Sequence, residues 1–100
     1  MKKRKIFLRR AAQADLVEAS SWYQAINPIL SNRLLIEMRT ASERIAERPL
    51  SFPIFLGATR RMHLKVFPYY VYFRLERSSI VIHGILHTRR DPKFHRKRAE

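Results

Sequence analysis

Apolar residues recur every three or four positions through the first half of the chain. Residues 11–26 and residues 28–48 each carry one such stripe, formed by Ala12, Leu16, Ala19, Tyr23 and Ile26 in the first segment and by Leu30, Leu34, Met38, Ala41 and Ile45 in the second. This spacing predicts two amphipathic helices. Asn27 suits the N-cap of the second helix and Pro28 its first position, and Pro49 ends it. The short connection predicts an antiparallel helical hairpin.

The period changes to two in the second half of the chain. Residues 60–67 and 69–76 alternate apolar with polar or aromatic side chains, and residues 79–88 are apolar on both faces, as in a central strand. Residues 5–9 predict a short opening strand, and the prolines and glycine of residues 49–58 predict a loop.

This order of elements, β-α-α-β-β-β, predicts an α+β domain with the helical hairpin packed on one face of a mainly antiparallel sheet. Trp22 and Tyr23 are expected in the core between the helices and the sheet. The other face of the sheet is expected to display one group of polar and aromatic side chains, namely Arg61, His63, Lys65, Tyr70, Tyr72 and Arg74.

Length and composition fit a single domain over residues 1–100. The chain is 46% hydrophobic and 29% charged, which is enough apolar material to fold. There are no cysteines, which excludes disulfides and thiolate chemistry and fits a reducing compartment. The apolar runs are too short for a membrane span or a signal peptide. We therefore expect a cytoplasmic protein without a membrane partner.

Positive charge concentrates at both ends of the chain. The net charge is +13, and residues 1–10 contribute +6 while residues 89–100, the basic C-terminal tail, contribute +4. Fifteen of the 21 cationic side chains are arginine, which favours bidentate recognition of phosphate or carboxylate. An acidic partner is expected, either nucleic acid or an acidic protein.

Several segments, taken in order, resemble one protein family. These are "AQADLVEASSWYQAINPILSNRLLIEM", "ERPLSFPIF", "FPYYVYFRL" and "ILHTRRDP", which together cover about residues 5–98. They resemble the RelE/ParE superfamily of type II toxin–antitoxin toxins, the plasmid stabilisation proteins. The resemblance implies an acidic antitoxin that wraps around the toxin, and a toxin–antitoxin complex that binds operator DNA through the antitoxin.

The superfamily has two branches with different targets. RelE-like members cut mRNA in the ribosomal A site without a metal, and ParE-like members inhibit DNA gyrase. Motif by motif, one arginine of the nuclease branch falls at Tyr70 here, and a second matches Arg89. Tyr70 in that place favours the ParE-like branch. The alternative is a ribosome-dependent mRNA endonuclease, whose phosphorane charge and proton transfers would be served by Arg61, Lys65, Arg74, His87 and Arg89.

His87 has two readings, a general acid or base in a nuclease or a strand-end histidine whose ring orders the tail. A metal site is not expected, because His83 and His87 would lie about 13 Å apart along a strand, too far to share one ion. No cofactor is expected. The tyrosines near residue 70 suit base stacking or simply a half-buried sheet.

The basic tail is expected to be extended or turned at its Asp-Pro pair and to contact a partner, with Phe94 as an apolar anchor. The residues assigned to target binding are Arg89, Arg90, Phe94, Arg96, Lys97 and Arg98. Those assigned to the antitoxin are Arg61, Lys65, Tyr70, Tyr72 and Arg74, with the hairpin and a sheet edge also available to it.

Overall fold

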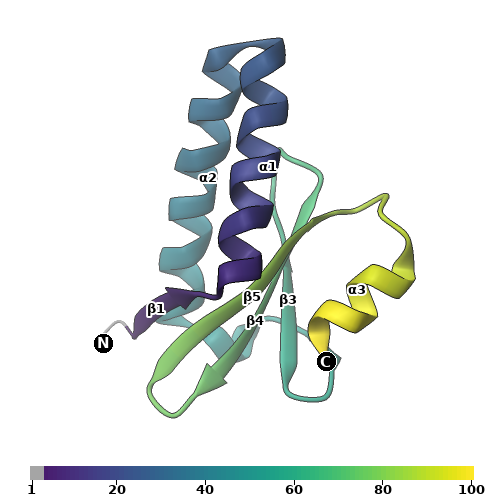
Figure 1. The fold of residues 1–100 in the computed structure, drawn as a ribbon. Helices are drawn as coiled ribbons and strands as arrows, with labels where there is room; N and C mark the ends of the chain where they lie inside the picture. Colours follow the sequence, from purple (N-terminus) through teal and green to yellow (C-terminus); the bar gives the residue numbers. More distant parts are fainter. Residues whose placement is uncertain (1–3) are drawn as a thin grey trace.

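The computed structural model describes residues 4–100, which form three α-helices and one five-stranded sheet (Figure 1). The order is β1 (Lys5–Leu8), α1 (Arg10–Ile26), α2 (Pro28–Glu47), the 3₁₀ turn η1 (Pro49–Ser51), β2 (Ile54–Leu56), β3 (Thr59–His63), β4 (Tyr69–Glu76), β5 (Ser79–His87) and α3 (Pro92–Ala99). Within residues 4–100, no helix is long and apolar enough to cross a membrane.

The strands lie in the order β1-β5-β4-β3-β2. Only β1 runs parallel to its neighbour, with Ile6 opposite Ile80, and the other pairs are antiparallel. The predicted α+β class and the mainly antiparallel sheet are therefore confirmed.

The helical hairpin forms as predicted and covers one face of the sheet. The Asn27 side chain accepts a hydrogen bond from the Ile29 N–H (3.0 Å) and so caps α2. The main core lies between the hairpin and the sheet and includes Leu34, Ile45 and Phe73, all fully buried. Trp22 is an exception to the prediction, since 66% of it is exposed, whereas Tyr23 packs edge-on against Phe67.

The predicted loop at residues 49–58 contains a further strand, β2, which pairs with β3. Gly57 has a φ of +57° in the turn between them, a conformation that glycine adopts without strain. The sequence prediction missed β2 because it has only three residues and follows two prolines, which normally indicate a loop.

The predicted strand at residues 60–67 ends earlier, at His63. The Glu37 carboxylate of α2 accepts hydrogen bonds from the backbone N–H groups of Lys65, Val66 and Phe67, so these groups bind a side chain instead of another strand. Val66 is consequently 79% exposed, and Lys65 lies in a loop instead of on the sheet face.

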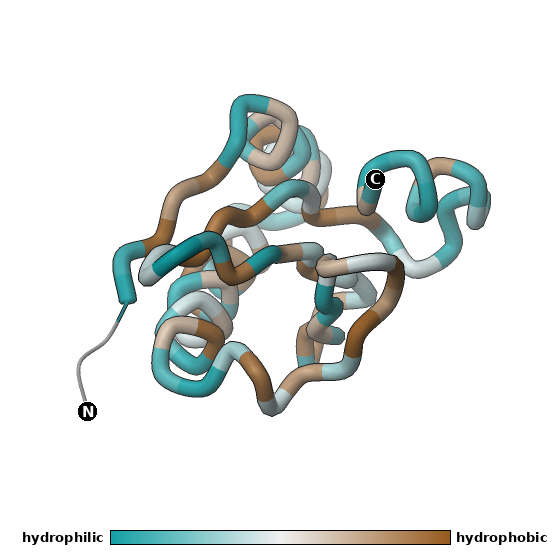
Figure 2. The backbone as a smooth tube through the Cα atoms, turned by 90° about the horizontal axis from the view of Figure 1, so that it is seen from below, coloured by the Kyte–Doolittle hydropathy of each residue, from teal (hydrophilic) through white to brown (hydrophobic). Residues whose placement is uncertain are grey.

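The basic tail is also different from the prediction, because it folds into α3 on the sheet face opposite the hairpin. A second, smaller core forms there from Tyr72, Leu86 and Ala99, with Phe55 and Tyr70 beside it. The backbone of α3 is drawn mostly in hydrophilic colours (Figure 2). The sheet is thus covered on both faces where α3 lies, and the expected open basic face is reduced in size.

Candidate functional site

The buried ring of His95 attaches α3 to the sheet. Its Nε2 donates a hydrogen bond to the His87 carbonyl oxygen (3.1 Å), and its Nδ1 accepts one from the Tyr72 hydroxyl (2.6 Å). Because a carbonyl oxygen can only accept, the proton of a neutral ring lies on Nε2. Tyr72 is fully buried under α3, so it is not on the surface that we predicted for antitoxin binding.

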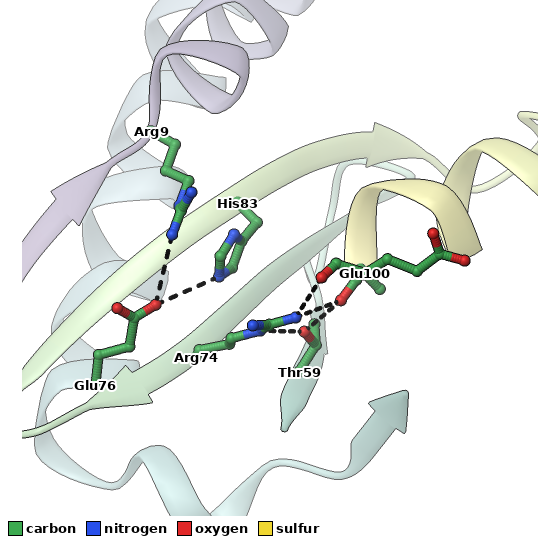
Figure 3. A network of polar contacts seen from close by, with 7 residues as sticks. Arg9, Thr59, Arg74, Glu76, His83 and Glu100 are labelled. Carbon is green, nitrogen blue, oxygen red and sulfur yellow. Dashed lines mark hydrogen bonds and ion pairs between the residues drawn. The ribbon is translucent and has the colours of Figure 1, made fainter. Parts of the chain in front are cut away.

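Arg74 holds the end of α3 to the sheet (Figure 3). Its Nε donates to Thr59 Oγ1 (2.9 Å), and its Nη2 donates to the carbonyl oxygens of Ala99 (3.0 Å) and Glu100 (2.7 Å). Thr59 Oγ1 in turn donates to the Ala99 carbonyl (2.7 Å). The Nε and Nη2 donors of Arg74 therefore stabilise the C-terminal helix, and its role in catalysis or antitoxin binding stays a prediction.

Arg98 connects α3 with α1 past the edge of β5. Its Nη1 forms an ion pair with Asp15 Oδ2, which also accepts a hydrogen bond from the Ile85 N–H (2.9 Å). A Cβ on Gly84 would lie 2.6 Å from Arg98 Cγ, so glycine leaves room for this side chain. Arg98 was predicted to bind the target, but the structure gives it an intramolecular partner.

A pocket of about 270 Å³, here called the arginine pocket, lies between the sheet and α3. Its lining residues are Phe55, Arg61, Tyr70, Thr88, Arg90, Pro92, His95 and Arg96. The Arg61 guanidinium lies over the rings of Phe55 (4.6 Å) and Tyr70 (4.0 Å), and Arg90 lies over Phe94 (4.5 Å). Cation–π contacts of this kind hold the guanidinium groups in place without neutralising them.

Burial changes the proton affinity of the groups beneath α3. Burial lowers the pKa of His95 from its ordinary value of 6.5, and the cations of Arg61 and Arg90 lower it further, while the hydrogen bond to His87 opposes the change. Burial also raises the pKa of Tyr72 above 10.0, partly offset by Arg61. His95 is therefore held neutral and works as a structural donor and acceptor.

This lowered pKa predicts that α3 docking weakens in acid. The folded state binds a proton at His95 less readily than the unfolded state does. The contribution of neutral His95 to the free energy of unfolding is therefore fully present above pH 6.5 and is lost as the pH falls through the pKa of the folded state. The measurement is urea unfolding at pH 7.5 and at pH 5.5. His95→Gln, which keeps a donor and an acceptor, should show a smaller pH difference than the original chain. An equal pH difference in His95→Gln and in the original chain would contradict the assignment.

The remaining predicted residues divide into two groups. Arg61, Lys65 and Tyr70 line a common groove beside the arginine pocket, so these antitoxin-site candidates are brought together. Arg89, Arg90, Phe94, Arg96 and Lys97 are exposed, as a binding role requires. Phe94 is not the anchor of the tail, since 52% of it is exposed and His95 and Ala99 are buried instead.

The ring of His87 contacts the start of the tail and a neighbouring strand, while its role as a general acid or base stays a prediction. Its Nδ1 accepts a hydrogen bond from the Arg89 N–H (3.1 Å), and its ring lies edge-on to Tyr69 (5.2 Å between centroids). Among residues 4–100 there is no group of three His, Cys, Asp or Glu side chains able to hold a metal ion.

Sequence reasoning missed Asp15, Thr59 and His95, whose partners are far away along the chain. The sequence did contain a local signal for the start of α3, namely Asp91–Pro92, which repeats the order of capping residue and proline seen in Asn27–Pro28. The Asp91 side chain accepts from the Lys93 N–H (2.9 Å) and caps α3.

Comparison with known proteins identifies the family. Residues 6–92 match the family model described as the ParE toxin of the type II toxin–antitoxin system parDE. The chain belongs to the ParE toxin family. The resemblance predicted from the sequence motifs is thereby confirmed, and this ParE-family toxin is a component of a toxin–antitoxin system.

A solved structure shares the fold. The chromosomal ParDE toxin–antitoxin system from P. aeruginosa contains a chain that superposes with a TM-score of 0.75 at 19% identity, covering 85% of this ParE-family toxin and 96% of that chain. A comparison with curated proteins gives no significant match. Most of α3 lies beyond the residues that the family model matches.

Proposed function

We propose that this ParE-family toxin binds and inhibits DNA gyrase and performs no bond cleavage of its own. Tyr70 stands where the nuclease branch has an arginine, and the substitute considered from the sequence was Arg74. The observation that carries the proposal is that the Nε and Nη2 groups of Arg74 hold Thr59 and the end of α3. The proposed nuclease set therefore lacks a free arginine on β4, the strand on which the nuclease branch carries one to stabilise phosphorane charge.

The cationic surface around α3 supports a target-binding role. Arg89, Arg96 and Lys97 are exposed, and no ion pair joins any of them to a carboxylate within residues 4–100. Exposed cations without partners attract an acidic surface at long range. We assign target contact to this group, together with Arg90 and Phe94.

The antitoxin of this system is proposed to cover the helical hairpin and the groove of Arg61, Lys65 and Tyr70. Large apolar side chains remain more than 40% exposed on the two helices, namely Val17, Trp22, Ile26, Ile29, Leu35 and Ile36. Such exposed apolar side chains favour a protein partner. An acidic antitoxin segment also complements the net charge of +13, and its own DNA-binding part is proposed to bring the complex to operator DNA.

The purified toxin should inhibit gyrase supercoiling and leave mRNA intact in a translating ribosome extract. Both assays are run on one preparation, with the antitoxin complex as the inactive control. Cleavage of mRNA in the ribosomal A site together with unaffected supercoiling would refute the gyrase assignment in favour of the RelE-like alternative.

His87→Ala should reduce gyrase inhibition only as far as it reduces the folded fraction. The variant loses the acceptor for the Arg89 N–H, which costs about 0.5–1.5 kcal/mol. His87→Asn keeps an acceptor and should retain more stability. Thermal unfolding, supercoiling inhibition and toxicity in cells are measured side by side, and a large loss of toxicity in a fully folded His87→Ala protein would indicate catalysis.

A further inference from the structure

Three arginines from three separate segments line the arginine pocket. Arg61 comes from β3, Arg90 from the segment between β5 and α3, and Arg96 from α3. Thr88 adds a hydroxyl, and no acidic side chain lines the pocket. Within residues 4–100, no ion pair joins any of the three arginines to a carboxylate. The positive charge of this pocket is therefore left without an intramolecular partner.

The aromatic contacts of two of these arginines restrict their orientation. Arg61 lies against Phe55 and Tyr70, and Arg90 lies against Phe94. A guanidinium group that contacts a ring with its flat face keeps its N–H edge for an oxyanion. These side chains lose less conformational freedom when a ligand binds than unrestrained surface arginines would.

The arrangement distinguishes between two kinds of oxyanion. One arginine donates two parallel bonds to a carboxylate or to a phosphate. A carboxylate is flat, whereas the tetrahedral oxygens of a phosphate also accept from donors that approach from other sides. The donors here come from three segments around one pocket. Three cations are enough to neutralise a phosphomonoester, whose charge is about −1.5 to −2 at pH 7.

We propose that the arginine pocket is a binding site for a phosphomonoester, the phosphate group carried by a nucleotide or by the phosphorylated end of a nucleic-acid strand. The volume of about 270 Å³ is slightly below the range for pockets that enclose a whole drug-sized ligand. The pocket therefore takes the phosphate and the adjoining sugar and leaves the base outside.

This site does not follow from membership of the family. His95 and Arg96, which form one wall, lie beyond residues 6–92 that match the ParE family model. The pocket shares Arg90 and Arg96 with the surface assigned to target contact, but its test does not depend on the gyrase target, because it measures ligand binding by the toxin alone.

The test uses the folded full chain and four probes at 150 mM salt. These are inorganic phosphate, adenosine 5′-monophosphate, a single-stranded oligonucleotide with a 5′-phosphate, and the same oligonucleotide with a 5′-hydroxyl. We expect saturable binding of the phosphate-bearing probes by calorimetry or NMR titration, with the 5′-hydroxyl strand weaker than its phosphorylated form. A preference for the mononucleotide identifies a free nucleotide as the source, and a preference for the phosphorylated strand identifies a strand end.

Two pairs of neighbouring residues provide variants matched in charge. Arg90→Ala and Arg96→Ala remove cations that line the pocket, and each should raise the Kd for adenosine 5′-monophosphate about tenfold. Arg89→Ala and Lys97→Ala remove one positive charge next to them but outside the pocket, and each should change the Kd less than about twofold. Thermal unfolding of all four variants verifies that they fold.

Three outcomes would overturn the proposal. One is no saturable binding of any phosphate-bearing probe. Another is an equal loss of affinity in all four variants, which would mean diffuse attraction by the net charge. The third is that an acidic peptide displaces the bound nucleotide and loses affinity in Arg90→Ala and Arg96→Ala more than the nucleotide does, which would assign the pocket to a carboxylate.

Discussion

Phe73→Ala is expected to lower the free energy of unfolding by about 3–5 kcal/mol. Phe73 is fully buried in the main core, where its ring lies edge-on to that of Phe52 (5.9 Å between centroids). Truncation removes apolar contacts and leaves a cavity that the packed helices cannot fill. Because a domain of this size has only about 5–15 kcal/mol of stability in total, the loss is a large fraction of it. Urea unfolding followed by circular dichroism measures the change.

The adjacent residue supplies the control for this prediction. Tyr72 lies on the other face of β4 beneath α3, so Tyr72→Ala should release α3 while the main core persists. Hydrogen exchange should then show lost protection in residues 92–99 for Tyr72→Ala and in both helices of the hairpin for Phe73→Ala. If Phe73→Ala affects α3 alone, or costs less than about 1 kcal/mol, the division into two cores is wrong.

Asp15→Ala is expected to cost about 3 kcal/mol and to release α3. The side chain of Asp15 is only 10% exposed, and its Oδ2 atom serves both the Ile85 N–H and the Arg98 guanidinium. The pairing of β1 with β5 ends where Leu8 lies opposite Ile82, so β1 offers no acceptor to the Ile85 N–H. The Asp15 carboxylate accepts this hydrogen bond in place of a strand. Truncation leaves a backbone donor and a half-buried cation without a partner, and water satisfies them only if α3 moves away.

Unfolding free energy and limited trypsin digestion measure this effect. Trypsin cuts after lysine and arginine, so a released α3 should be cleaved at Lys93, Arg96 and Lys97 faster than in the original chain. Arg98→Ala should give the same cleavage pattern, and the double variant should cost less than the sum of the two single variants. Glu18→Ala, an exposed carboxylate on the same helix, should stay within about 0.5 kcal/mol of the original. Equal effects of Asp15→Ala and Glu18→Ala would show that the ion pair does not hold α3.

The sequence predicted most of the fold because its signals are local. The helical hairpin follows from the stripe that contains Leu34 and Ile45 and from the cap at Asn27, all within a few turns. Two of the strands follow from local patterns as well, β4 from alternation over eight residues and β5 from a nine-residue run that is apolar on both faces. These patterns indicate which side of a helix or strand faces the core, independently of which other element packs against that side.

The site was harder to predict because its contacts join distant parts of the chain. Tyr72 and Arg74 were expected on an open face, and their alternation with Val71 and Phe73 places them correctly on the side away from the hairpin. Alternation cannot say that a later segment covers that side. Arg61 and Tyr70 remained accessible, while Tyr72 and Arg74 became the base on which α3 rests.

The sequence by itself determined the helical hairpin, the main strands and the excess of positive charge at both ends of this ParE-family toxin. Only the tertiary structure decided that the charged tail is a helix. An isolated helix of eight residues is unstable in water, since so few backbone hydrogen bonds cannot offset the cost of nucleation. The stability of α3 comes from three contacts with distant residues. His95 binds Tyr72, Arg98 binds Asp15, and the Ala99 carbonyl oxygen binds Arg74, and these partners lie 23, 83 and 25 residues away in the chain.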